Sequence, residues 1–312
     1  MDLTDWPNRT GRYNSPMKVF VTGASGYIGR HVVEVLVRAG LVVTGLARSG
    51  EAAALVKALG ANVRNGDLTD PGTWVPGTRD FDAVIHIALA GAATDRVLVP
   101  MLIDAMAGAN GNAGRPFIYT SGVWVMGNTG DRIAGESWPL YKAPAISAWR
   151  KEIEQMMLDA RERHVRSVVL RPATVYGRGT GAGDGVVGRM VDQGRRDGVI
   201  RVPGDGANRK SHVHCEDLAD LYLAALQQSP AGELYVAADG PALPVSQVAE
   251  AAAKISGARI EYIPAEVARA EMGPIAEAHL LDQKIGSTKA GRLLGWKPSR
   301  HSVLKYLESL AG

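Results

Sequence analysis

The stretch "VFVTGASGYIGRHVVEVLVRAG", residues 19–40, decides the fold. Its first residues, 19–22, are apolar and mostly β-branched, which predicts a short buried strand. Glycines follow at positions 23, 26 and 29, and apolar residues then recur at helical spacing. Glycines let the backbone turn tightly beside a pyrophosphate, and a helix N-terminus offers that anion free N–H groups. A strand, a glycine turn and a helix in this order predict a dinucleotide site, the alternative being a merely tight turn.

The end of the second predicted strand, residues 41–46, indicates which dinucleotide is bound. A carboxylate at this place would bind the adenosine ribose hydroxyls and repel a 2′-phosphate. Here Ala47 takes that place, and Arg48 and Ser49 follow. A guanidinium suits a phosphate, so the sequence favours NADP, with NAD possible. The alternative is that Arg48 is an ordinary solvated surface residue.

Strands and helices continue to alternate along the chain. Apolar runs at 82–88, 116–121 and 166–170 predict further strands, and helical spacing appears at about 95–107 and 148–164. Repeated strand–helix units predict an α/β fold of the Rossmann type, a doubly wound parallel sheet with helices on both faces.

Local composition suggests how the chain divides into domains. Residues 1–16 are polar and are expected to form a disordered tail. Residues 17–176 are expected to form the dinucleotide-binding domain, with 207–228 returning to it. Residues 177–312 are expected to form mainly a smaller, C-terminal substrate lobe, and the segment "ELYVAADG" is assigned to that lobe.

Composition excludes several classes of function. The net charge of +3 is too small for a nucleic-acid binder that relies on broad phosphate attraction. A single cysteine, Cys215, allows neither an internal disulfide nor a cysteine zinc cluster, and no metal site is expected. The single cysteine also makes a cytoplasmic location the expectation. The chain has no run of 18 apolar residues, so no membrane span is expected.

Several further motifs resemble the extended short-chain dehydrogenase/reductase family, of the epimerase/dehydratase type. They are "GDLTD" at 66–70, "HIALA" at 86–90, "LRPATVYGRG" at 170–179, "SHVHCEDLADLYLAAL" at 211–226 and "STKAGRLLGWKP" at 287–298. The cofactor contacts that the turn and this resemblance together imply are Gly23, Ser25, Gly26, Tyr27, Ile28, Gly29, Arg48, Ser49, Asp67, Leu68, Ala88, Lys151 and Pro172.

The catalytic positions depart from the pattern of that family, which uses a Ser or Thr, a Tyr and a Lys. In "SGVWVMG", residues 121–127, the position of the hydroxyl is Gly122, with Ser121 beside it. Lys151 is taken as the family's lysine, and Ser147 then occupies the place of the tyrosine. A serine hydroxyl is a far poorer acid or base than a phenol. Lys151 is expected to hold the nicotinamide ribose, unless it is only a solvated helix residue.

A proton donor would therefore have to be nonstandard. The candidates are Ser147, Ser121, Tyr141, Tyr176, His212 and a water molecule, although the likeliest role of His212 is structural. Sugar 4,6-dehydratases carry an acidic pair just after the Ser/Thr position. This chain has Val123 and Trp124 there, which argues against that dehydration.

On the substrate side, two arginines are candidates. Arg178 opens a glycine-rich loop that either closes over a polar substrate or is a flexible connection. Arg209 lies where the resemblance puts an arginine on a nucleotide diphosphate. The resemblance also suggests a homodimer, formed by the helices near 95–107 and 148–164.

Two hypotheses follow. The first is an NAD(P)-dependent oxidoreductase or epimerase that acts on a polar sugar or carbonyl substrate, with a nucleotide-linked sugar as one option. The second is a catalytically inactive NADP-binding sensor or scaffold. The enzyme is favoured because a polar loop and Arg209 would have no use in a pure sensor.

Overall fold

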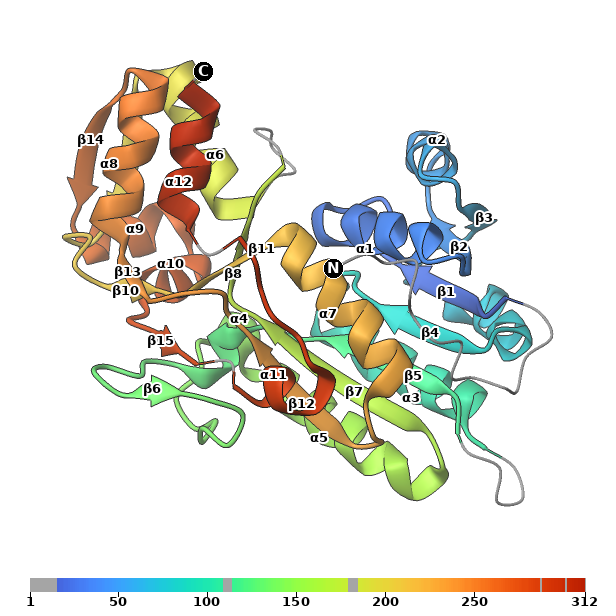
Figure 1. Ribbon diagram of the computed structural model, residues 1–312. Coiled ribbons are helices and arrows are strands. Elements are labelled where there is room, and N and C mark those ends of the chain that lie inside the picture. Colours follow the sequence, from blue (N-terminus) through green and yellow to red (C-terminus); the bar gives the residue numbers. More distant parts are fainter. Residues whose placement is uncertain (1–15, 109–113, 179–184, 287, 301, 312) are drawn as a thin grey trace.

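A seven-stranded, all-parallel sheet forms the centre of the computed structural model (Figure 1). The structure describes residues 16–108, 114–178, 185–286, 288–300 and 302–311, so the expected tail at 1–16 lies almost wholly outside the described residues. The strand order is β12-β7-β5-β4-β1-β2-β3. The strands are β1 (Lys18–Thr22), β2 (Val42–Ala47), β3 (Asn62–Asn65), β4 (Ala83–His86), β5 (Pro116–Thr120), β7 (Arg166–Pro172) and β12 (Glu233–Ala237).

The strand order reverses between β1 and β4. From β1 the chain runs outward through β2 to β3, and it then returns to the other side of β1 and runs outward again through β4 and β5. In open parallel sheets, ligands bind beyond the carboxyl ends of the strands at such a reversal. The predicted doubly wound Rossmann-type fold is confirmed, and the glycine turn lies at this point.

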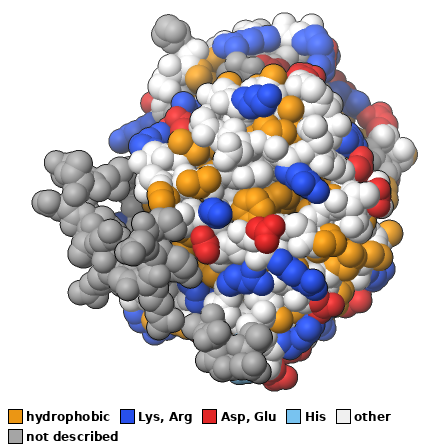
Figure 2. Space-filling view, turned by 90° about the vertical axis from the view of Figure 1, so that its right-hand side faces the viewer, with side chains coloured by type: hydrophobic (Ala, Val, Ile, Leu, Met, Phe, Trp, Pro, Cys, Tyr) orange, Lys and Arg blue, Asp and Glu red, His pale blue; other side chains and the backbone are white. Residues whose placement is uncertain are grey.

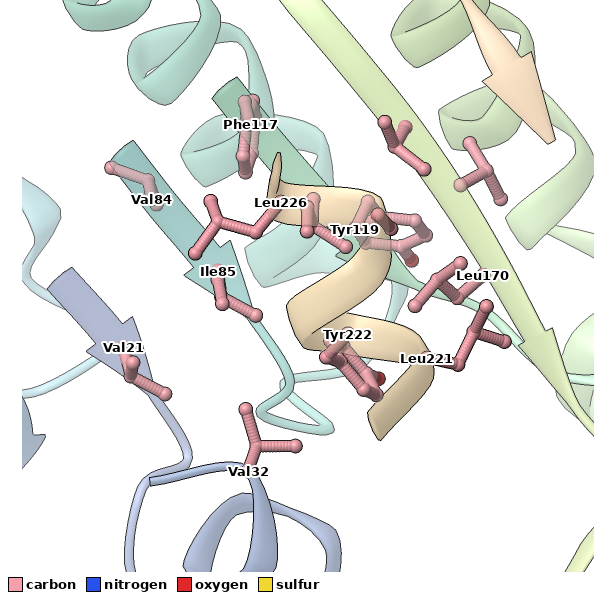
Figure 3. Close-up of a cluster of buried hydrophobic side chains, with 14 of the residues drawn as sticks. Val21, Val32, Val84, Ile85, Phe117, Tyr119, Leu170, Leu221, Tyr222 and Leu226 are labelled. Carbon is pink, nitrogen blue, oxygen red and sulfur yellow. The ribbon is translucent and has the colours of Figure 1, made fainter. Parts of the chain in front are cut away.

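Helices cover both faces of the sheet (Figure 1). On one face α1 (Tyr27–Arg38) packs against α7 (Cys215–Gln228), and on the other α3 (Ala92–Met106) packs against α5 (Arg150–Asp159). The core fills the space between the layers. In Figure 3, side chains of the central strands, such as Ile85 and Leu170, meet Leu221 and Leu226 of α7. Three further elements border this layer: α2 (Gly50–Ala58), α4 (Ala145–Ala148) and α11 (Lys289–Leu294).

The seventh strand, β12, corrects one sequence-based assignment. Its residues belong to "ELYVAADG", a segment that the sequence assigns to the small lobe, but β12 pairs in parallel with β7 along its whole length. It follows α7 directly, so it completes one more strand–helix–strand unit. The sequence of a five-residue apolar strand does not by itself indicate which sheet the strand joins.

A smaller lobe has a core of its own, at the upper left of Figure 1. Two parallel strands, β9 (Val199–Pro203) and β14 (Arg259–Ile263), lie beside α6 (Gly185–Asp197) and α8 (Val245–Ser256). The remaining helices after β14 are α9 (Ala265–Met272), α10 (Ile275–Leu280) and α12 (Val303–Glu308). Short strands join the lobe to the sheet: β6 (Ile133–Ala134), β8 (Thr174–Tyr176), β10 (Arg209–Lys210), β11 (His212–His214), β13 (Leu243–Pro244) and β15 (Lys284–Ile285).

The surface on the side of α2 and β3 is mixed in character. Acidic, basic and apolar side chains are interspersed there (Figure 2), as a net charge of +3 leads one to expect. Among the described residues, no helix has both the length and the apolar character needed to cross a bilayer. No cluster of potential metal ligands occurs among them either.

The apolar face of α5 packs on the sheet. Ile153 and Met157 are fully buried in the main core. On the outer side Arg96 of α3 pairs with Glu152, so two exposed charges lie where a partner helix would pack. A homodimer through α3 and α5 stays a prediction.

A buried ion pair fixes α5 on the sheet. Arg171 of β7 donates to both carboxylate oxygens of Glu154, at 2.9 and 2.5 Å, and both side chains are almost fully buried. Two charges that are out of water depend on each other, because removing one leaves the other uncompensated.

We predict that Glu154→Ala lowers the free energy of unfolding by about 3–5 kcal/mol, because Arg171 is left buried without its carboxylate. The matched control is Glu152→Ala, two residues away, which removes an exposed pair with Arg96 and costs ~1 kcal/mol or less. Denaturant titration of the two variants measures both values. Equal losses would show that the buried pair has no special weight.

Candidate functional site

The glycine turn brings the end of β1 against the end of β4. Gly23 has a φ of 71°, a left-handed conformation that favours glycine. A Cβ atom on Gly23 would lie 2.7 Å from the backbone nitrogen of Ala88. The structure thus brings together two residues that the sequence assigned to the cofactor, although they are 65 positions apart.

The start of α1 is shaped for an anion. Gly26 donates its N–H to the carbonyl of Gly23 at 3.0 Å, and a Cβ on Gly29 would lie 1.9 Å from that same oxygen. Gly26 is the N-cap residue, and it has no side chain that could cap the first N–H groups of α1. A backbone cradle that a single Cβ would fill, at an uncapped helix N-terminus, fits the pyrophosphate of a dinucleotide. Ser25 and Ile28 flank this cradle, both partly buried.

Tyr27, also expected at the cofactor, has a side chain with a structural task. Its hydroxyl donates to the carbonyl of Gly177 at 2.8 Å, where the chain leaves β8 for the small lobe. Arg178, the next residue, pairs with Glu34 of α1 at 2.7 Å and with Glu216 of α7 at 3.3 Å. The loop that Arg178 was expected to open, 179–184, lies outside the described residues.

The adenine side is formed by the ends of β2 and β3. Arg48 is 82% exposed, and its Nε lies 3.9 Å from Oδ2 of Asp67. Hydrogen bonds from the N–H and hydroxyl of Thr69 hold the pKa of Asp67 below its usual value. Ser49 caps α2 by accepting from the N–H of Ala52. Leu68 is partly buried against the core.

Beside these residues lies an open depression of about 540 Å³ between α2 and β3. Arg48 and Lys57 both line it, together with Ser49 and two asparagines, Asn62 and Asn65. Arg48 just after β2 and Lys57 in the last turn of α2 give this side of the site a positive character.

The expected catalytic residues lie just after β5, in α4 and in the first turn of α5, and they differ in their surroundings. Ser147 is buried and donates to the carbonyl of Pro144 at 3.3 Å, whereas the side chain of Lys151 is exposed. Ser121 is buried, and none of the residues that the structure describes forms a hydrogen bond with its hydroxyl. Pro172 is buried at the end of β7.

Arg150, which the sequence analysis missed, is the cation that points to the strand ends. Its Nη1 donates to the hydroxyl of Tyr119 at 2.9 Å and to the carbonyl of Thr120 at 2.8 Å, and its guanidinium lies 4.7 Å from the Trp149 ring centroid. The signal was helical periodicity. Residue 150 precedes the buried Ile153 and Met157 by three and seven positions, which puts it on the buried face of α5.

A chain of buried hydrogen bonds holds the partners of Arg150. The hydroxyl of Tyr119 donates to Asp95 at 2.9 Å, the other oxygen of Asp95 lies 3.2 Å from Nε2 of His86, and Nδ1 of His86 lies 2.6 Å from the hydroxyl of Thr22. Burial, and the negative charge of Asp95, raise the pKa of Tyr119 well above its usual range. Tyr119 therefore stays protonated, and it accepts from Arg150 while donating to Asp95.

The other proton-donor candidates are placed elsewhere. Tyr176 lies in the core of the small lobe, where its hydroxyl donates to the carbonyl of Arg300 and burial raises its pKa above the usual range. Tyr141 is 70% exposed. His212 is buried beside a cavity between the two lobes, where Trp124 of the strand end also lies.

Arg209 forms ion pairs with two carboxylates. Its guanidinium donates to both oxygens of Asp282, at 2.9 and 2.5 Å, and to Asp131 at 2.9 Å. These contacts hold the pKa of Asp282 below its usual value. An anionic substrate would have to displace both carboxylates, so a diphosphate contact for Arg209 stays a prediction.

Comparison with known proteins bears on this site. The profile of the family described as "NAD dependent epimerase/dehydratase family" matches residues 19–238. An uncharacterised protein of Schizosaccharomyces pombe is 30% identical over 94% of this chain and 99% of its own. A 4-hydroxy-2-methyl-3-oxo-4-farnesyl-3,4-dihydroquinoline-1-oxide ketoreductase of Stigmatella aurantiaca is 30% identical over 81% of this chain and 78% of its own.

Among solved structures, the UDP-glucose 4-epimerase of Thermotoga maritima matches with a TM-score of 0.76. It is 21% identical, and the match covers 95% of this chain and 97% of that one. At this level of identity the likeness shows the shared fold.

We predict that Gly29→Ala weakens dinucleotide binding by more than about tenfold, a loss of ~1.4 kcal/mol, because the added Cβ must push the carbonyl of Gly23 out of the turn. The control is Gly72→Ala, where a Cβ meets open space. Calorimetric titration with NADH and NADPH measures the effect. Wild-type affinity in Gly29→Ala would place the dinucleotide elsewhere.

Proposed function

The chain belongs to the NAD dependent epimerase/dehydratase family, and we propose that within it this protein is an NAD(P)H-dependent reductase of a carbonyl group. The observation that carries the proposal is Arg150, the guanidinium at the carboxyl ends of the strands. Its Nη1 is held by Tyr119 and Thr120, and the half-buried guanidinium has further N–H donors to offer a ligand.

A guanidinium is suited to the reduction of a carbonyl rather than to the oxidation of an alcohol. Arginine stays protonated in proteins, so Arg150 cannot take the proton from an alcohol, which the oxidising half of an epimerisation requires. It can stabilise the negative oxygen that develops when a carbonyl is reduced. When bound, the reduced nicotinamide supplies a hydride to the carbonyl carbon, and the resulting alkoxide takes a proton from water to give the alcohol.

The buried chain of hydrogen bonds positions Arg150 for this task. Asp95 fixes the hydroxyl of Tyr119, and Tyr119 accepts from Arg150. The guanidinium therefore keeps one orientation before the substrate binds, as an oxyanion-stabilising group must. Ser121, with its unpartnered hydroxyl, and Ser147 are secondary donors in this proposal.

Two observations favour a carbonyl compound over a sugar nucleotide as substrate. Arg209 is paired with Asp131 and Asp282, so its guanidinium is already neutralised. The Stigmatella aurantiaca relative is, by its name, a ketoreductase, and it is 30% identical to this chain. A sugar-nucleotide epimerase is the second candidate, which the fold shared with UDP-glucose 4-epimerase supports.

For the cofactor we propose NADPH, with the 2′-phosphate held by Arg48 and Ser49. Arg48 is free to turn toward a phosphate, because its contact with Asp67 is long and exposed. Lys57 adds positive charge in the adjoining depression. The family itself is described as NAD dependent, so NADH is the natural comparison.

We predict that wild type binds NADPH more tightly than NADH, and that Arg48→Ala weakens NADPH binding about 10–100-fold, the loss of one charge-assisted contact. NADH affinity should hardly change. Arg64→Ala is the control, because Arg64 is an exposed arginine of the neighbouring strand β3 that contacts the carbonyl of Thr73. Equal wild-type affinities for the two cofactors would rule out the preference.

We predict that Arg150→Met lowers kcat for carbonyl reduction by ~10²–10³, the usual effect of removing an oxyanion donor. Lys151→Met, the adjacent exposed cation, should leave kcat nearly unchanged. The assay follows NADPH oxidation with a panel of ketones and aldehydes. A severe effect of Lys151→Met would restore the lysine to the role that the family resemblance gave it.

The same panel tests the inactive-sensor alternative. If NADPH binds tightly but no ketone, aldehyde or sugar nucleotide is turned over, the reductase proposal is wrong. Turnover of UDP-sugars alone would instead favour the epimerase.

A further inference from the structure

A narrow cavity lies between the two lobes. Its walls are largely apolar, from Trp124 at the end of the sheet to the helices α6 and α8, and the space inside amounts to about 40 Å³. The apolar lining consists of Trp124, Val186, Val187, Met190, Pro203, Val245, Val248 and Ala278. The polar lining consists of Thr174, Lys210, His212 and His279. The room is enough for a small polar group.

Lys210 brings a cation to this apolar space. It neighbours Arg209, but side chains alternate along a strand, so Arg209 points to Asp131 and Asp282 while Lys210 lines the cavity. Its ammonium donates to the carbonyl of Ala278 at 2.8 Å, and no carboxylate among the described residues forms an ion pair with it. An ammonium has three donors, so Lys210 can still donate to a ligand.

His212 supplies the second unsatisfied group. It is only 5% exposed, and its buried Nδ1 has no hydrogen-bond partner within the described part of the chain. Burial, and then the charge of Lys210, lower the pKa of His212 to about 4, so the ring is neutral and carries one N–H donor. Buried polar atoms are almost always paired in folded proteins, and an orphaned one at a cavity wall points to a ligand.

We propose that this cavity binds the carboxylate of an apolar oxo acid, with Lys210 as its cation and His212 as a neutral donor beside it. The proposal rests on the proposed function, because it names the substrate class of that same site. Trp124 lies four residues after Thr120, which contacts Arg150, so the cavity adjoins the strand end where the carbonyl would be reduced. The acid group anchors in the cavity, beside the apolar residues of its lining.

The charge of Lys210 makes this binding depend on pH. Burial lowers the pKa of Lys210 to about 7, and Asp282 opposes that shift. The other titratable groups facing it are His212 and His279, whose pKa values burial lowers to about 4, and Arg189 of α6 lies near His279. Lys210 is therefore charged below pH 7 and loses its charge above it, so affinity for a carboxylate should fall as pH rises through about 7 to 8.

The direct test uses octanoate, which cannot be reduced, and measures its binding by calorimetry in the presence and absence of NADPH. Wild type should bind octanoate better than the neutral octan-1-ol, and Lys210→Met should weaken octanoate binding about 10–100-fold while leaving octanol unchanged. Lys210→Arg keeps the charge at all pH values, so it should bind octanoate with no loss above pH 7. Lys254→Met removes an exposed charge on α8 of the same lobe and is the control.

Two outcomes would overturn the inference. One is equal binding of octanoate and octanol by wild type, and the other is an unchanged octanoate affinity in a folded Lys210→Met variant. A second measurement separates this inference from the proposed function, by comparing turnover of 2-oxooctanoate and its methyl ester with NADPH. Lys210-dependent octanoate binding without any turnover would support the acid site and contradict the reductase. Turnover of both compounds with equal KM would support the reductase and contradict the acid site.

Discussion

The buried ion pair between Glu154 and Arg171 is the interaction on which the arrangement of the site depends. It joins α5 to β7 in the interior, and thereby sets which face of α5 meets the sheet. One turn before Glu154, that same face carries Arg150, so the guanidinium reaches the strand ends. Beyond Arg171, β7 continues into the segment that enters the small lobe. One interior contact thus fixes the position of Arg150 relative to the central sheet and to the segment that leads into the small lobe.

The first half of the fold could be predicted because its signals are local. Strand, glycine turn and helix succeed one another within residues 18–38, and the geometry at Gly23 and Gly29 leaves no room for other residues. Strands β1, β2, β4, β5 and β7 were predicted from their apolar runs, whereas β3 was missed because its sequence, NVRN, is mostly polar. The placement of β12 was wrong, because which sheet a short apolar strand joins depends on its neighbours in space.

In the candidate site, family spacing and helical periodicity select different cations. Family spacing selects Lys151, whose side chain is exposed, whereas the periodicity of α5 selects Arg150 on its buried face, and the choice between them stays a prediction. The ion pair of Arg209 with Asp282 could not be predicted from the sequence. Its partner Asp282 is 73 residues away and approaches only because β10 lies beside the segment after α10. The surroundings of Lys210 could not be predicted either, because the cavity beside it is lined by residues from distant parts of the chain.

The edges of the central sheet decide how the protein behaves at high concentration. An exposed edge offers unpaired N–H and carbonyl groups to strands of other molecules, which is a route to aggregation. At one edge, β3 is only four residues long and carries Arg64 and two asparagines. At the other, side chains already occupy the backbone of β12, since Lys289 donates to the carbonyl of Leu234 and Glu136 accepts from the N–H of Val236. Intermolecular strand addition is thereby disfavoured at both ends, which keeps a parallel sheet of this size from growing beyond its own chain.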